Sequence, residues 1–245
     1  MVSRCLAYAV VAISVAAQTP AGAEPRAVIE LFTSQGCSSC PPADKLLAEL
    51  AADPSLIAIS VPIDYWDYLG WKDTLADPHN AARQKGYSRV RGDGQVYTPQ
   101  AVVNGSLHAL GSDKSAIEHA IEQSHQKSAA VLSLPVSLAF GEGMLKVSVP
   151  DVSAARANVE VWMCGLTKAV TVAIGRGENK GRTVTYHNVI RRWVKLGEWS
   201  GKSESWNVPT RTFSNDGIDA AAVFVQGGTL EKPRAIVGAS YASVH

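Results

Sequence analysis

The sequence lacks an excess of charge of either sign. Its 23 lysines and arginines are balanced by 22 aspartates and glutamates, so the formal net charge is +1 at pH 7. It also lacks long runs of like charge and internal repeats. Balanced charge provides no electrostatic attraction to nucleic acid or to an anionic membrane surface. We therefore expect no nucleic-acid partner.

Long apolar runs are missing as well. The apolar stretch at residues 5–17 follows Arg4 and is shorter than the ~20 residues that a membrane-spanning helix needs. Ala21, Gly22 and Ala23 then resemble the cleavage site of a secretory signal peptide. We predict that residues 1–23 are a signal peptide and that the mature protein is periplasmic or secreted, with no membrane contact. An uncleaved anchor is the alternative.

Cysteine is scarce. Of the four cysteines, Cys5 lies in the predicted signal peptide, which leaves Cys37, Cys40 and Cys164. An exported protein meets an oxidising compartment, in which disulfides persist. An odd count leaves at least one thiol without an intramolecular partner. We expect Cys164, in an alternating strand pattern, to be a buried inert thiol.

The length of 245 residues fits one or two domains, and the pattern of the sequence changes near residue 130. Residues 26–33 and 56–63 read as buried strands around a helix at 43–53, which predicts two parallel strands. Further elements of this half are expected at residues 78–87 and 113–125 (helices) and at 98–105 and 106–112 (strands).

From residue 130 onward, short strands of alternating pattern are separated by glycine-rich turns. This pattern indicates an antiparallel, sandwich-like or barrel-like all-β domain. We therefore predict two domains after the signal peptide, an α/β domain at residues 24–128 and a β domain at 129–245.

Cys37 and Cys40 follow the first strand and open the first helix, and Thr98 and Pro99 precede the third strand. In this order of elements, residues 26–126 resemble the thioredoxin-like fold. The resemblance implies a cis-proline at Pro99 that faces the two cysteines. The predicted fold class is thus an α/β thioredoxin-like domain followed by an all-β domain.

The whole chain is also similar to a family of exported bacterial proteins of unknown function (DUF1223-type). Four segments suggest it: "ELFTSQGCSSCPPAD", "IDYWDYLGWKD", "YTPQAVVNG" and "YHNVIRRWVKLGEW". The label of that family supplies no reaction, so the chemistry has to be argued from the residues.

A thiol attacks a disulfide as its thiolate, and a helix N-terminus favours that anion. We expect Cys37, on the loop side, to be the exposed attacking thiol and Cys40 to be the buried resolving thiol. Because Pro41 and Pro42 suit a first helical turn, regular helix is expected to begin near Ser39 or Cys40. The predicted function is thiol–disulfide exchange with cysteines of other exported proteins, without a cofactor.

Glu30 is a lone carboxylate in an apolar strand, and burying such a group is costly unless it is paired or neutral. Thioredoxin-like oxidoreductases often keep an acid at this strand, and the resemblance implies that Glu30 relays a proton to Cys40. An outward-facing glutamate is the alternative.

Three further residues are candidates for binding a substrate. The backbone of Thr98 could pair with a substrate strand. Trp66 and Tyr68 leave the carboxyl end of the second strand, an edge that borders the functional crevice in open α/β sheets. Their aromatic rings could bind a protein partner, or they could simply cover the core.

Two other functions remain open at this point. Two thiolates could hold Cu(I), as in a copper chaperone, with His108 as the candidate third ligand. Zinc would need two more ligands, and the sequence has no Cys or His pair at suitable spacing. Alternatively, the pair is a structural disulfide in a non-catalytic binding protein.

Overall fold

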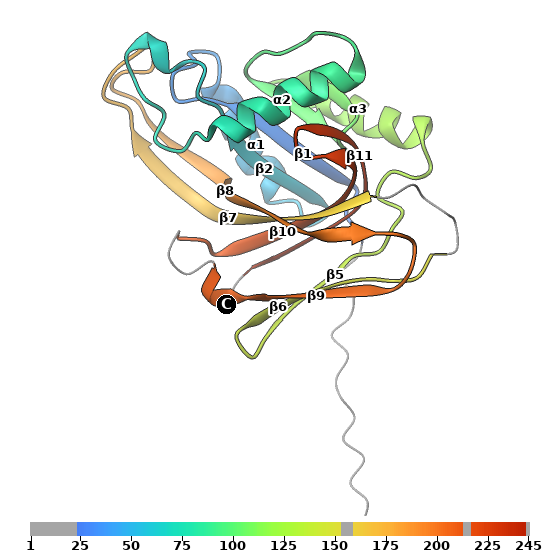
Figure 1. Ribbon diagram of the computed structural model, residues 1–245. Coiled ribbons are helices and arrows are strands. Elements are labelled where there is room, and N and C mark those ends of the chain that lie inside the picture. Colours follow the sequence, from blue (N-terminus) through green and yellow to red (C-terminus); the bar gives the residue numbers. More distant parts are fainter. Residues whose placement is uncertain (1–23, 153–158, 213–216, 244–245) are drawn as a thin grey trace, which may run out of the picture.

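The computed structural model describes residues 24–152, 159–212 and 217–243. The predicted signal peptide, residues 1–23, lies outside this range. The described residues form one eight-stranded sheet with the order β11-β10-β7-β8-β2-β1-β3-β4, and a three-stranded sheet with the order β5-β6-β9 (Figure 1). Within the described ranges, no helix is long and apolar enough to cross a membrane.

The N-terminal half supplies the four strands at one end of the large sheet. β1 (Ala27–Thr33) and β2 (Leu56–Pro62) pair in parallel, which confirms the prediction for these two segments. Every residue of both strands is buried, as expected for apolar strands covered on both faces. β3 (Gln100–Val103) pairs antiparallel with β1, and β4 (Leu107–Leu110) pairs with β3.

Helices cover both faces of this end of the sheet. α1 (Pro41–Ala51) and α3 (Lys114–Lys127) pack on the face that carries Ile29 and Leu31 of β1. α2 (Pro78–Arg91) packs on the opposite face, which carries Val28 and Phe32. Side chains alternate along a strand, so Glu30 points to the α2 face and away from α1. A short 3-10 helix, η1 (Asp67–Leu69), lies between β2 and α2.

The C-terminal half continues the same sheet. β7 (Val159–Ala173) and β8 (Thr183–Trp199) form a long hairpin, and β10 (Ala220–Thr229) and β11 (Lys232–Ser243) follow on from β7. The small sheet consists of β5 (Ser137–Gly141), β6 (Met144–Val149) and β9 (Glu204–Pro209), which is followed by the 3-10 helix η2 (Thr210–Thr212). It packs its apolar side chains against β7 and β10, on the face of the large sheet opposite to the one that α2 covers (Figure 1).

The predicted fold class, a thioredoxin-like α/β domain followed by a separate all-β domain, is wrong. β8 pairs in parallel with β2 at Ser60 and Val189, so strands of both halves share one mixed sheet in a mostly β protein. The free edge of β2 offers unpaired backbone groups to which another strand can add, and β8 occupies it. The division at residues 128 and 129 into two domains stays a prediction.

Candidate functional site

Cys37 and Cys40 form a disulfide where β1 has ended and α1 begins. Their Cα atoms are 5.4 Å apart, within the usual range for a bridged pair. Cys40 is the N-cap residue of α1 and Pro41 starts the helix, which confirms the expected start near Cys40. The backbone carbonyl of Cys40 accepts hydrogen bonds from the N–H groups of Ala43 and Asp44, at 2.8 and 3.0 Å.

The disulfide is covered by the loop at residues 174–182, which joins β7 to β8. Asn179 is buried, and its Nδ2 donates to the carbonyl oxygens of Gln35 and Cys37 at 2.9 and 2.8 Å. The N–H of Ser38 donates to the Glu178 carboxylate at 3.3 Å. Cys37 is therefore only 3% exposed and Cys40 is fully buried, so the predicted exposure of Cys37 is wrong.

Aromatic side chains surround the cysteine loop. Gly36 lies against Trp66, since a Cβ on Gly36 would come within 2.9 Å of Trp66 Cβ. Trp66 Nε1 donates to Thr98 Oγ1 at 2.7 Å, and Tyr68 stacks on Trp66 and is 76% exposed. The structure thus brings Trp66 and Thr98 together beside the cysteine loop, with Tyr68 facing outward.

The Thr98–Pro99 peptide bond is cis, as predicted. The Pro99 carbonyl accepts a hydrogen bond from the Gly111 N–H at 2.9 Å. Gly111 packs closely between Pro99 and β1. A Cβ on Gly111 would lie 2.5 Å from Leu31 Cδ1 and 3.1 Å from Pro99 Cβ. Pro99 therefore lies next to the end of β1 from which the cysteine loop departs.

Glu30 is fully buried, as the pattern of its strand suggests, but its partners differ from the predicted one. Its carboxylate forms an ion pair with Arg83 of α2, with Arg83 Nε 2.7 Å from Oε1 and Nη2 3.1 Å from Oε2. The hydroxyl of Tyr87 also donates to Oε2. Both carboxylate oxygens are thus engaged on the α2 face of the sheet, whereas Cys40 begins α1 on the other face.

The buried ion pair is part of a larger network. Arg83 Nη2 donates to Gln226 Oε1 of β10 at 2.8 Å, and the guanidinium lies 4.4 Å from the ring centroid of Trp193 on β8. Glu30 and Arg83 therefore connect elements of the two halves of the chain. This network explains why an acid is tolerated in the apolar strand β1.

Asp44, which was not predicted from the sequence, is a buried carboxylate on the helix that Cys40 caps. It is 2% exposed, and its Oδ1 accepts a hydrogen bond from Thr33 Oγ1 at 2.7 Å. Its Oδ2 has no hydrogen-bond partner among the described residues. Burial raises the pKa of this carboxyl to about 7, the Thr33 hydrogen bond opposes the rise, and the charge of Asp73 adds to it. The spacing of four residues from Cys40 was the available signal.

The described residues contain no group of three or more His, Cys, Asp and Glu side chains that could hold a metal ion. His108 Nδ1 lies 2.9 Å from the Tyr97 hydroxyl, and His108 Nε2 lies 3.3 Å from Asp93. Cys164 is fully buried with a free thiol, as expected, and burial raises its pKa well above the ordinary value.

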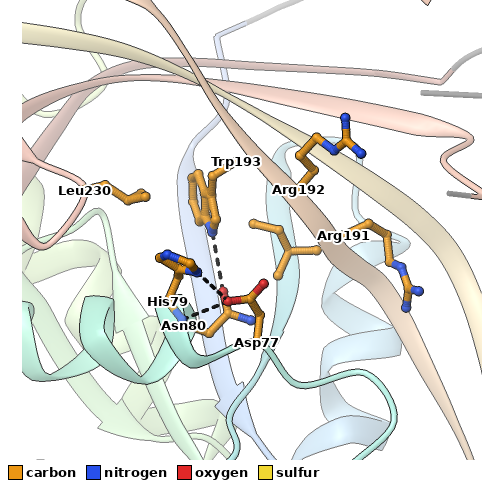
Figure 2. Close-up of a pocket in the computed structure, with 8 residues that line it drawn as sticks. Asp77, His79, Asn80, Arg191, Arg192, Trp193 and Leu230 are labelled. Carbon is orange, nitrogen blue, oxygen red and sulfur yellow. Dashed lines mark hydrogen bonds and ion pairs between the residues drawn. The ribbon is translucent and has the colours of Figure 1, made fainter. Parts of the chain in front are cut away.

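A pocket of about 380 Å³ lies between the start of α2 and β8 (Figure 2). Trp193 Nε1 points to Asn80 Oδ1 across 3.4 Å, and His79 is held by Asp77. The side chains of Arg191 and Arg192 extend away from Trp193 and His79 in Figure 2. The charged groups of this pocket therefore do not converge on a common point, and its lining contains no Ser, Thr, Cys, Tyr or Lys side chain.

Comparison with known proteins supports the resemblance to the DUF1223-type family. The family described as "Protein of unknown function (DUF1223)" matches residues 28–226. The X-ray crystal structure of protein AGR_C_4864 from Agrobacterium tumefaciens is similar, with 32% sequence identity and a TM-score of 0.79. That match covers 90% of this chain and 95% of the other. No curated protein matches. The chain therefore belongs to the DUF1223 family, whose function is unknown.

Proposed function

We propose that the protein is an exported thiol–disulfide oxidoreductase that exchanges its Cys37–Cys40 disulfide with cysteines of other exported proteins. The observation that carries the proposal is the position of this disulfide at the N-terminus of α1. Exchange releases a thiolate from a disulfide. The positive end of the helix dipole stabilises such an anion, while Pro41 and Pro42 of the first turn offer it no N–H group.

In the proposed reaction, a substrate thiolate attacks Cys37 Sγ and forms a mixed disulfide. The Cys37–Cys40 bond breaks, and its electron pair stays on Cys40 Sγ, which takes up a proton. A second substrate thiolate then attacks the substrate sulfur of the mixed disulfide and releases Cys37. The substrate dithiol is oxidised to a disulfide while the protein disulfide is reduced to two thiols. The reverse sequence reduces a substrate disulfide.

The surroundings of the disulfide support binding of a protein substrate. The side chain of Tyr68 is 76% exposed, and it stacks on Trp66 beside the cysteine loop. Aromatic side chains that remain exposed next to a reactive group are suited to anchor a partner. Thr98 accepts a hydrogen bond from Trp66 and would contact the same substrate segment. Substrate would reach Cys37 only after the loop at residues 174–182 moves aside.

The second candidate is a non-catalytic binding protein in which Cys37–Cys40 is a structural disulfide. The burial of both cysteines favours it, because a structural bond has no need of access. The two functions differ in whether the bond turns over in the folded protein.

Turnover of insulin disulfides tests the proposal, and trapping identifies the attacking cysteine. Cys40→Ser should accumulate mixed disulfides at Cys37, because the resolving thiol is missing, and Cys37→Ser should not. Both variants are compared by non-reducing mass analysis after incubation with a cysteine-containing peptide. No insulin turnover, or equal trapping by both variants, would contradict the proposal.

A further inference from the structure

Asp44 and Cys40 lie on the same buried side of the first turn of α1. Cys40 has helical dihedral angles, φ −79° and ψ −35°, and the Asp44 N–H donates to its carbonyl. Side chains four residues apart on a helix are neighbours one above the other. Cys40 is fully buried and Asp44 is 2% exposed, so water is excluded from both.

One oxygen of the Asp44 carboxylate accepts a hydrogen bond, and the other has no hydrogen-bond partner among the described residues. Oδ1 accepts from Thr33, while Oδ2 is buried without a partner in the described structure. A buried acceptor without a donor costs free energy. The cysteines are in the disulfide state here, and a disulfide sulfur carries no proton to donate. In the reduced protein, the Cys40 thiol becomes a donor on that side of the helix.

The groups packed around Asp44 do not supply a positive charge. Thr33 of β1 is neutral, β2 carries no titratable residue, and β8 contributes Tyr186. The remaining ionisable neighbour is the carboxyl of Asp73, which is itself buried. Burial first, and then the charge of Asp73, raise the pKa of Asp44 to about 7. Both the acid and its conjugate base are therefore present near neutral pH.

We propose that Asp44 exchanges a proton with Cys40 during thiol–disulfide exchange, an inference that rests on the proposed function. When a substrate thiolate attacks Cys37 Sγ, the Cys37–Cys40 bond breaks and its electron pair stays on Cys40 Sγ. The protonated Asp44 carboxyl gives its proton to that sulfur and becomes a carboxylate. In the reverse direction, the carboxylate takes the proton back as Cys40 attacks Cys37 Sγ and the partner leaves as a thiolate.

Glu30 does not compete for this role. It projects from the opposite face of β1, and both of its oxygens are held by Arg83 and Tyr87. Asp44 combines the features that Glu30 lacks, namely a place on the helix that carries Cys40 and an unused oxygen.

The test is single-turnover reduction of the oxidised, full-length protein by dithiothreitol between pH 5 and pH 9. Tryptophan fluorescence follows the reaction, and each rate is divided by the concentration of dithiothreitol thiolate. For the wild-type protein, the normalised rate should fall through an inflection near neutral pH as Asp44 loses its proton. Asp44→Asn keeps the size and polarity but cannot donate, so the inflection should vanish and the rate at pH 6 should drop on the order of 10²-fold.

Asp73→Asn is the matched control, because it removes another buried carboxyl near the same helix. It should keep the inflection, shifted to lower pH by loss of the neighbouring charge. If Asp44→Asn is reduced with the wild-type rate and pH profile, the role of Asp44 is refuted while the proposed function stands. If the wild-type disulfide is reduced only on unfolding, the proposed function itself fails.

Should Asp44→Asn not fold, infrared difference spectra of the wild-type protein, oxidised minus reduced, provide a second test. Reduction near neutral pH should change the band of protonated carboxyl groups, because Asp44 changes its protonation or its hydrogen bonding when Cys40 becomes a thiol. Asp73→Asn should leave that change in place. An unchanged carboxyl band in the wild-type protein would overturn the inference.

Discussion

At the residue scale, two of the buried carboxylates of the N-terminal half, Glu30 and Asp44, have opposite surroundings. Glu30 is paired with a guanidinium and a phenol, whereas Asp44 has a single hydroxyl donor. A buried acid with a matched cation favours its charged form, and a buried acid without one favours its neutral form. Glu30 is therefore suited to stabilise the structure, and Asp44 is suited to transfer a proton.

Substituting Glu30 by Gln should destabilise the protein, contrary to what a lone buried acid would predict. The change leaves Arg83 charged and unpaired in the core, which typically costs about 3–5 kcal/mol. Urea unfolding measures the loss. Glu49→Gln, on the exposed side of α1, should stay within about 0.5 kcal/mol of the wild-type protein. A Glu30→Gln variant of wild-type stability would show that the ion pair contributes nothing.

Asp44 should make the stability depend on pH with a definite sign. Its folded-state pKa of about 7 lies above the ordinary value of 3.8, so the folded protein binds this proton more tightly than the unfolded chain. The free energy of unfolding should therefore fall as the pH rises from about 4 to about 7, by up to about 4 kcal/mol. Asp44→Asn should remove this fall, as measured by urea unfolding at pH 4.5 and pH 8. The same pH dependence in both proteins would contradict the assignment.

At the element scale, the loop of the β7–β8 hairpin covers the disulfide at the start of α1. Figure 1 shows the tip of this hairpin beside the segment between β2 and α2. The contact is close, because a Cβ on Gly175 or on Gly177 would come within 3.1–3.2 Å of Trp71. Asn179 connects the hairpin loop to the cysteine loop, because its Nδ2 donates to two backbone carbonyl oxygens there.

Asn179→Ala should make the disulfide easier to reach. The variant loses hydrogen bonds to the carbonyls of Gln35 and Cys37, each contributing about 1 kcal/mol, so the loop should open more often. Reduction by dithiothreitol should then become roughly 30-fold faster, because the two bonds together contribute about 2 kcal/mol. Lys180→Ala changes an exposed neighbour in the same loop and should leave the rate unchanged. Equal rates for the wild-type protein and Asn179→Ala would mean that the loop does not limit access.

α2 is fitted closely against the turn between β10 and β11. A Cβ on Gly86 would lie 2.1 Å from the carbonyl oxygen of Glu231. Glycine to alanine in a helix usually stabilises by up to about 1 kcal/mol, but here it should destabilise by about 1–3 kcal/mol because α2 has to move outward. Thermal unfolding compares Gly86→Ala with Lys85→Ala, an exposed neighbour in the same helix. A Gly86→Ala variant with an increased melting temperature would contradict this packing.

Local patterns were sufficient to predict most elements of the N-terminal half. The apolar runs of β1 and β2 and the spacing of Leu46, Leu47 and Leu50 in α1 concern neighbouring residues, and these elements are found in the structure. The cis bond before Pro99 was implied by the resemblance to thioredoxin-like proteins, and it is present as well. The acid in β1, Glu30, could also be identified from the sequence. Its partner Arg83 is 53 residues away in the chain, and only the packing of α2 reveals it.

At the scale of the whole molecule, one sheet runs through both halves of the chain. The sequence does change near residue 130 from mixed helices and strands to strands. The pattern of a strand, however, does not reveal which sheet edge that strand will pair with. β8 pairs with β2 across a sequence separation of about 130 residues, and the side chain of Asn188 on β8 donates to the carbonyl of Ala58. The separate β domain failed as a prediction because pairing between distant strands leaves no local signal.

This joining of the halves also shapes the candidate site. The N-terminal half supplies the disulfide, Asp44 and Trp66, while Asn179 and Glu178 of the C-terminal half bind the backbone of the cysteine loop. The C-terminal half thereby becomes part of the site instead of an appended module. In the proposed function, it decides when Cys37 meets a substrate.

The reduction potential of the Cys37–Cys40 pair tests the central claim most directly. The full-length folded protein is equilibrated with defined ratios of reduced and oxidised dithiothreitol, and the free thiols are alkylated and counted by mass. A pair that exchanges disulfides with other proteins should have a potential above about −300 mV. A potential below that value would identify a structural disulfide and contradict the proposed function.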